Sequence, residues 1–217
     1  MPEAVIFDLD GVLVDSEQLW NGAKKEVVLS TGGHWRDDAP MAMIGMSSPE
    51  WSRYMHDQLS VPGDVEEINH EVVQRMEQAY RARLPLLPGA TEAVRGLQSQ
   101  WPLGLASSSN REIIDLVLQL AGLTDSFRAT VSSEEVEHGK PAPDVYLEGA
   151  RCLGVAPTSC VAIEDSSNGL RSAAAAGMAV IAVPNPHYPP DADAVALAVA
   201  VVKSVAEVTP ALVGSLR

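Results

Sequence analysis

Cysteine, basic residues and long apolar runs are all scarce in this 217-residue chain. Its two cysteines, Cys152 and Cys160, lack the spacing of a metal site and are too few for a disulfide framework, so we expect both to be reduced, buried side chains. The apolar run at 194–202 is well short of the roughly 20 residues of a membrane-spanning helix. No basic segment precedes the first apolar run, as it would in a signal peptide. These absences predict a soluble, cytoplasmic protein.

Positive charge is the second shortage. The chain has 15 Lys and Arg residues against 29 Asp and Glu residues, which gives a net charge of −14. A surface this acidic repels nucleic acids and anionic membranes, and we expect neither as a partner. No exposed heptad or large apolar stripe indicates an obligate protein partner, so we expect a monomer.

Short runs with strand character recur along the chain, at 4–7, 103–107, 129–133, 160–164 and 179–183. The first, fourth and fifth are apolar nearly throughout, as in strands that are covered on both faces. Helical patterns separate the runs: one, "REIIDLVLQLAGL", stops at Gly122, and another, "DVYLEGARCLG", follows Pro143. This alternation predicts an α/β fold with a doubly wound parallel sheet.

The alternation is interrupted between about residues 17 and 82, where no convincing strand occurs. The pattern of "SPEWSRYMHDQL" predicts a helix capped by Ser47 or Ser48, and "EEINHEVVQRMEQAYRARL" predicts a longer amphipathic helix. The chain returns through "RLPLLPGA", whose two prolines make a stiff linker. We therefore expect an all-helical cap at 16–82, inserted into an α/β core formed by 1–15 and 83–217.

Polar side chains follow four of the predicted strands. In an open parallel sheet, ligands bind where the carboxyl ends of the strands meet, so these side chains should share one rim. In strand order, the rim would carry Asp8 and Asp10, then the run from Ser107 to Asn110, then Lys140, and finally Glu164 and Asp165.

These residue types fit one kind of chemistry. Asp8, Asp10 and Asp165 would repel one another unless a hard divalent cation bound them, and Mg²⁺ prefers such oxygen ligands. A serine run at a helix N-terminus suits phosphate, and Lys140 adds a positive charge for a phosphoryl oxygen. Together they predict phosphoryl transfer to a carboxylate nucleophile.

Four motifs carry a family resemblance: "FDLDGVLVDSE", "LASSSN", "HGKPAPDVYL" and "IEDSSNG". In this order, and with a cap between the first two, they resemble the motifs of the haloacid dehalogenase-like hydrolases. The similarity is greatest to the branch that contains β-phosphoglucomutase and the small sugar-phosphate phosphatases. The resemblance implies a Mg²⁺-dependent phosphatase that acts on a small phosphomonoester, such as a sugar phosphate.

The resemblance also implies individual roles. Asp8 would be the nucleophile that forms an aspartyl-phosphate, and Asp10 the general acid and base, a role typically worth about 10²- to 10⁴-fold in rate. Mg²⁺ would be held by the Asp8 side chain, the Asp10 carbonyl and Asp165, with Glu164 as a ligand or directly behind the ligands. The transferring phosphoryl group would be bound by Ser107, Ser108, Asn110 and Lys140.

The cap would select the substrate, and its candidate residues are Glu17, Trp20, Ser47, Ser48 and Trp51. β-Phosphoglucomutase-like sequences place a histidine at the position of Trp20 and an arginine at that of Ser48, which argues against a mutase. A mutase nevertheless stays the alternative, followed by a catalytically idle binding protein of the same fold. The two tryptophans either pack within the cap or stack on the leaving group.

A phosphonate hydrolase would need a lysine in the cap that forms a Schiff base. Lys24 and Lys25 are the cap's lysines, and we expect both to be solvated. His138 and His187 are expected to be loop residues without a catalytic role.

Overall fold

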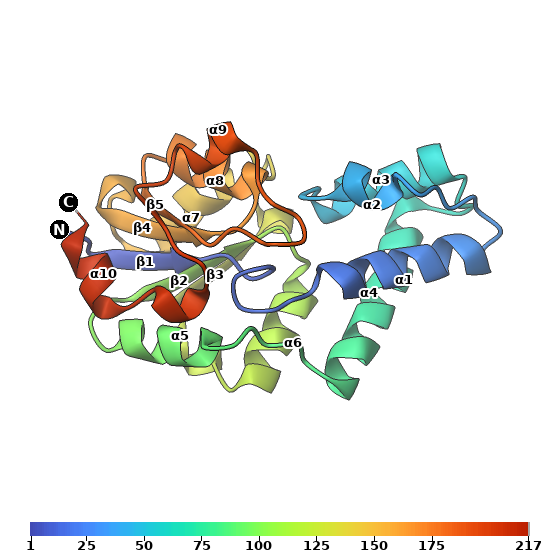
Figure 1. Cartoon of the computed structure of the whole chain (residues 1–217). Helices are drawn as coiled ribbons and strands as arrows, with labels where there is room; N and C mark the ends of the chain where they lie inside the picture. The colour runs from blue at the N-terminus through green and yellow to red at the C-terminus, as the bar shows by residue number, and fades with distance from the viewer. Residues whose placement is uncertain (217) are drawn as a thin grey trace.

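A six-stranded, all-parallel sheet forms the centre of the larger part of the molecule in the computed structural model, which describes residues 1–216 (Figure 1). Its strand order is β3-β2-β1-β4-β5-β6, so β1 is central. The strands are β1 (Ala4–Phe7), β2 (Leu103–Ser107), β3 (Ala129–Ser132), β4 (Cys160–Glu164), β5 (Ala179–Ala182) and β6 (Ala200–Val201).

The five predicted strands are confirmed, with ends that agree to within one residue. The sixth, β6, was missed because two residues are too few to give a readable periodicity. It pairs with β5, which is therefore an interior strand, and this explains the apolar character of β5 on both faces.

Helices cover both faces of the sheet, as predicted for a doubly wound fold. Along β1, Val5 and Phe7 pack in the same cluster as the apolar side chains of α5 and α6, whereas Ala4 and Ile6 pack with those of α7 and α8. The helices of this part are α5 (Ala90–Gln98), α6 (Arg111–Ala121), α7 (Asp144–Leu153), α8 (Ser167–Ala175), α9 (Ala192–Val195) and α10 (Pro210–Ser215). The 3₁₀ turns are η1 (Thr124–Ser126), η2 (Ser133–Glu135), η3 (Pro157–Ser159) and η4 (Val205–Glu207).

The segment between β1 and α5 is helical and lies beyond one end of the sheet (Figure 1). Its helices are α1 (Glu17–Ser30), α2 (Ala39–Met43), α3 (Ser48–Leu59) and α4 (Val65–Ala82). Ser47 begins α3 through a capping box with Glu50, and α4 buries Ile68, Val72 and Met76 on one face. The apolar core of this segment is continuous with the core under α5 and α6.

Two further expectations concern single residues and the membrane. Cys160 is buried as expected, but Cys152 is exposed, because it lies on the outer face of α7. Among residues 1–216, no helix has the length and apolar character needed to cross a membrane.

Candidate active site

The loop after β1 turns so that its carboxylates stay at the end of the sheet. Gly11 makes this turn with a φ of +79°, a conformation that side chains disfavour. A Cβ atom at Gly11 would also lie 1.9 Å from Oδ2 of Asp165, which follows β4. Two loops from different strands therefore approach each other where there is room only for glycine.

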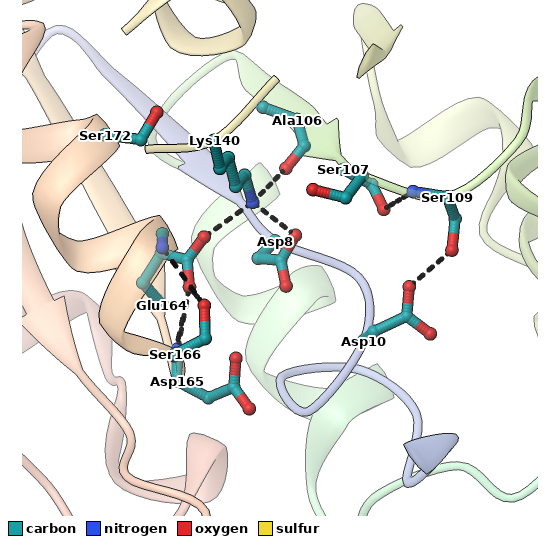
Figure 2. A network of polar contacts seen from close by, with 12 residues as sticks. Asp8, Asp10, Ala106, Ser107, Ser109, Lys140, Glu164, Asp165, Ser166 and Ser172 are labelled. Atoms are coloured by element: carbon teal, nitrogen blue, oxygen red, sulfur yellow. Dashed lines mark hydrogen bonds and ion pairs between the residues drawn. The ribbon is translucent and has the colours of Figure 1, made fainter. Parts of the chain in front are cut away.

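Lys140 connects the ends of three strands (Figure 2). Its Nζ donates to Oδ1 of Asp8 at 2.7 Å, to Oε1 of Glu164 at 2.6 Å and to the carbonyl oxygen of Ala106 at 3.1 Å. These three bonds use all three protons of the ammonium group. Burial alone would lower the pKa of Lys140, but the two carboxylates raise it above its ordinary value and keep the ammonium charged.

Glu164 is completely buried behind this lysine. Its carboxylate also accepts from the Tyr146 hydroxyl at 2.8 Å and from the backbone N–H of Asp165 at 3.0 Å. A Cβ atom at Gly169 would lie 1.9 Å from this carboxyl group, so α8 approaches it closely. Glu164 thus fixes the position of Lys140 through a fully paired carboxylate.

Three carboxylates, those of Asp8, Glu164 and Asp165, present oxygen atoms that all lie within 4.8 Å of one another and could hold a metal ion. The pKa of Asp8 is raised to about 8, chiefly by burial and also by the charges of Glu164 and Asp10, while Lys140 acts in the opposite direction. Burial and the Glu164 charge likewise raise the pKa of Asp165 well above its usual value. One lysine therefore does not balance the negative charge of this cluster, and a bound cation would.

Asp10 lies beside this cluster, and its carboxylate accepts three hydrogen bonds. The donors are Ser16 Oγ at 2.5 Å, Ser109 Oγ at 2.6 Å and Trp20 Nε1 at 3.3 Å. Trp20 belongs to the helical segment and Ser109 to the loop after β2, so Asp10 is held from both sides of the site. Ser16 and Ser109 are contacts that the sequence did not indicate, because nothing in a serine's local pattern marks its partner.

The serine run after β2 divides into two parts. Ser107 is fully buried, and its Oγ accepts from the backbone N–H of Ser109 at 3.0 Å. Ser108 and Ser109 instead face a cavity in front of the carboxylates.

Asn110 does not line this cavity. Its Oδ1 accepts from Ser48 Oγ on α3 at 2.6 Å, and its Nδ2 donates to Asn69 on α4 at 3.2 Å and to Glu134 at 2.7 Å. The side chain expected to bind phosphate thus connects the sheet domain to two helices of the inserted segment.

The cavity has a volume of about 460 Å³ and lies between the sheet and the helical segment. Of the predicted site residues, those that line it are Asp8, Asp10, Glu17, Trp20, Ser48, Trp51, Ser108, Lys140 and Asp165. Within the described residues 1–216, four other predicted site residues do not line the cavity: Ser47, Ser107, Asn110 and Glu164. Ser47 uses its side chain for the α3 cap, where its Oγ donates to Glu50 at 2.7 Å.

The loop after β5 also lines the cavity, through Asn185 and the stretch from His187 to Asp191. Arg171 on α8 fixes the end of this loop by donating to Asp191 at 2.9 Å and to Asp193 at 2.8 Å. We expected His187 only as a loop residue. The proline-rich stretch has no periodicity that could have placed it over the site.

Lys24 departs most clearly from expectation. We predicted that it is solvated, but only 5 % of it is exposed, and it lines the cavity next to Trp20 and Trp51. Lys25, by contrast, is exposed as predicted.

Comparison with known proteins agrees with this geometry. Residues 2–177 match the family model "haloacid dehalogenase-like hydrolase". Hexitol phosphatase B of Escherichia coli is 40% identical over 190 residues, which cover 85% of this chain and 84% of that protein. Fructose-1-phosphate phosphatase YqaB of the same species is 31% identical over 192 residues, covering 82% and 95%. The crystal structure of CbbY from Rhodobacter sphaeroides with phosphate has a TM-score of 0.83 at 26% identity, covering 95% and 96%.

Proposed function

The chain belongs to the haloacid dehalogenase-like hydrolases, and we propose that it is a phosphatase that hydrolyses a small phosphomonoester through an aspartyl-phosphate intermediate. The observation that carries the proposal is the contact of Lys140 Nζ with Asp8 Oδ1 at 2.7 Å, beside a three-carboxylate cluster at the carboxyl ends of β1 and β4. A buried carboxylate next to a cation and a metal site is suited to attack phosphorus.

In the first step, a carboxylate oxygen of Asp8 attacks the phosphorus atom, and the bond to the leaving alcohol breaks. Asp10 donates a proton to the departing oxygen as general acid. Lys140 gives up part of its bonding to Asp8 and neutralises the phosphoryl oxygens, together with backbone N–H groups near Ser108. The products of this step are the free alcohol and phosphorylated Asp8.

In the second step, Asp10, now ionised, takes a proton from water, which attacks the same phosphorus atom. The acyl-phosphate bond breaks, phosphate is released and the Asp8 carboxylate is restored. The three donors around Asp10 fix the direction of its carboxylate during the two proton transfers.

The residues present also fit a magnesium ion. We propose that the Asp8 and Asp165 side chains and the Asp10 carbonyl hold it, because the site offers only hard oxygen donors and excess negative charge. Glu164 is better placed to hold Lys140 than to bind the ion directly, since its oxygens are engaged by five donor groups: Lys140, Tyr146, the backbone N–H groups of 165 and 166, and the hydroxyl of Ser166. When bound, Mg²⁺ would neutralise the charge of the phosphoryl oxygens.

We infer that residues 16–82 act as a cap over the α/β core of 1–15 and 83–217, and that the cap selects the substrate. Its side chains form the wall of the cavity opposite the carboxylates, with Glu17, Trp20, Ser48 and Trp51 as contributors. The named relatives act on phosphorylated hexitols and fructose 1-phosphate, so we propose a sugar phosphate or similar compound as substrate. A cytoplasmic location and a monomeric state stay predictions.

A phosphate-shifting mutase is the second candidate, and the structure supports it less. A mutase needs a cationic anchor for a second phosphate, but Ser48 stands at the position where β-phosphoglucomutase-like sequences have an arginine, and its hydroxyl donates to Asn110. An idle binding protein is disfavoured by the intact set of Asp8, Asp10, Lys140 and Asp165.

The test is phosphate release from a panel of sugar and small-alcohol phosphates, with Mg²⁺ and with EDTA. We expect Mg²⁺-dependent release from a few compounds, and Asp8→Asn should lower the rate by roughly 10⁴-fold or more. The panel includes β-glucose 1-phosphate, followed for glucose 6-phosphate, since isomerisation without release would establish the mutase. Activity that survives in pure Asp8→Asn protein would refute the mechanism.

A further inference from the structure

A buried lysine that the mechanism does not use faces the cavity. Lys24 lies on α1, and its Nζ is 5.6 Å from the ring centre of Trp20 and 5.2 Å from that of Trp51. The two rings are themselves 6.1 Å apart, so they flank the same ammonium group. Cation–π contacts of this kind stabilise a charged lysine, but they leave its N–H donors without acceptors.

Those donors have no partner within the described protein. Among residues 1–216, the side chain of Lys24 forms neither a hydrogen bond nor an ion pair within 4.0 Å, in contrast to Lys140. Burial lowers the pKa of Lys24 to about 8 against the effect of the Glu17 carboxylate, so the group is still mainly protonated at pH 7. Lys24 thus presents to the cavity an ammonium group that has no acceptor from the protein, and a ligand in the cavity can supply one.

An acceptor of the protein stands nearby on the same helix. Glu17 precedes Lys24 by seven residues, which places both on one face of α1, and both line the cavity. The Glu17 carboxylate accepts from Asn21 Nδ2 at 3.2 Å. It forms no ion pair with Lys24, so a charged donor and a charged acceptor face the same space without neutralising each other directly.

We propose that Lys24 and Glu17 form a subsite for hydroxyl groups of the leaving alcohol, so that the enzyme prefers phosphates of polyhydroxylated compounds. This inference rests on the proposed phosphatase function. A hydroxyl group both donates and accepts, and it can therefore satisfy the lysine and the glutamate together. A second phosphate or a carboxylate fits less well, because Glu17 and Asp10 would repel it and the whole chain has a net charge of −14.

The test compares Lys24→Met with Lys25→Met on two substrates of equal carbon number, sorbitol 6-phosphate and n-hexyl phosphate. Methionine keeps the length of the side chain and its packing between the tryptophans but removes the charge and the donors. We expect Lys24→Met to lower the ratio of kcat/KM for the polyol phosphate over that for the alkyl phosphate by about tenfold or more, mainly through KM. The exposed Lys25 serves as the matched control, and its replacement should leave the ratio unchanged.

Several results would overturn the subsite. If Lys24→Met lowers kcat/KM equally for both substrates, Lys24 acts through packing or through Asp10. If kcat/KM changes for neither substrate, Lys24 contacts no hydroxyl group. A third result would show that the site binds an anion instead: a sugar bisphosphate is the best substrate of the wild type, and Lys24→Met lowers kcat/KM for that substrate alone.

A binding measurement separates this inference from the phosphatase function itself. Sorbitol 6-phosphate is titrated calorimetrically into Asp8→Asn and into the double variant Asp8→Asn/Lys24→Met. Binding that is about tenfold weaker in the double variant supports the subsite even if the wild type releases no phosphate. Equal binding by the two proteins, or binding by neither, overturns the subsite whatever the wild type hydrolyses.

Discussion

The two walls of the cavity differ in how completely their polar groups are paired. On the sheet side, Lys140 has three acceptors, and Glu164, which lies behind it, is enclosed by donors. On the helical side, Lys24 has no acceptor among residues 1–216, although it is equally buried. Paired groups of the first kind fix one geometry, which suits a chemical step that is the same for every substrate. Unpaired groups of the second kind can form hydrogen bonds with a ligand, which suits selection among substrates.

The largest effect should come from disturbing the paired wall at Gly11. In Gly11→Ala, the new methyl group would occupy the position of the Asp165 carboxylate, and the backbone would be strained at its φ of +79°. Since displacement of a catalytic group by about 1 Å can cost roughly 100-fold in rate, we expect a loss of at least about that size in kcat.

Gly122→Ala is the matched control, because Gly122 has a φ of +64° with nothing within 4 Å of the added Cβ. Both variants should lose about 1 kcal/mol of folding free energy through the left-handed conformation. Only Gly11→Ala should lose activity. Equal kcat values in the two variants would show that the Asp165 position is not critical.

The sequence predicted the paired wall well, for a physical reason. Asp8, Asp10 and Asp165 follow apolar strands, Lys140 lies in the loop after the third strand, and parallel strands bring their ends together whatever the details of packing. The predictions for Lys24 and Asn110 were wrong because the environment of each side chain depends on residues that are distant in sequence. The burial of Lys24 requires Trp51 from another helix, and the direction of Asn110 is set by Ser48 and Asn69 across the two parts of the molecule.

The next prediction concerns pH and the metal cluster on the paired wall. Without a cation, Asp8 has a pKa of about 8 in the folded protein, against about 3.9 for an unfolded chain. The folded state then binds its proton more tightly, so this contribution to stability is complete below about pH 4 and is lost as the pH rises through about 8. In EDTA, Tm should therefore fall between pH 6 and pH 8 by more than it falls in Asp8→Asn, whose amide does not titrate.

Magnesium should reverse this trend. At pH 6 the ion must displace a proton from Asp8, whereas near pH 8 it finds the carboxylate partly ionised, so Mg²⁺ should raise Tm more at pH 8 than at pH 6. Thermal unfolding at both pH values, with EDTA and with Mg²⁺, measures the effect. An Mg²⁺ effect that does not depend on pH would contradict the idea that the ion replaces the proton of Asp8.

The smallest effect is expected where the two walls meet, at the hydrogen bond from Ser48 to Asn110. Ser48→Ala should cost about 1 kcal/mol, or roughly 2–4 °C in Tm, because Asn110 Oδ1 loses its donor in a buried place. Ser52→Ala on the same helix is the control, since its equally buried hydroxyl bonds only to carbonyl groups of α3.

If the Ser48 bond holds the cap in register with the core, Ser48→Ala alone should raise KM by about threefold, while kcat changes little. If both variants lower Tm and neither changes KM, then the bond serves stability only, and the cap must be positioned by the apolar core that it shares with α5 and α6.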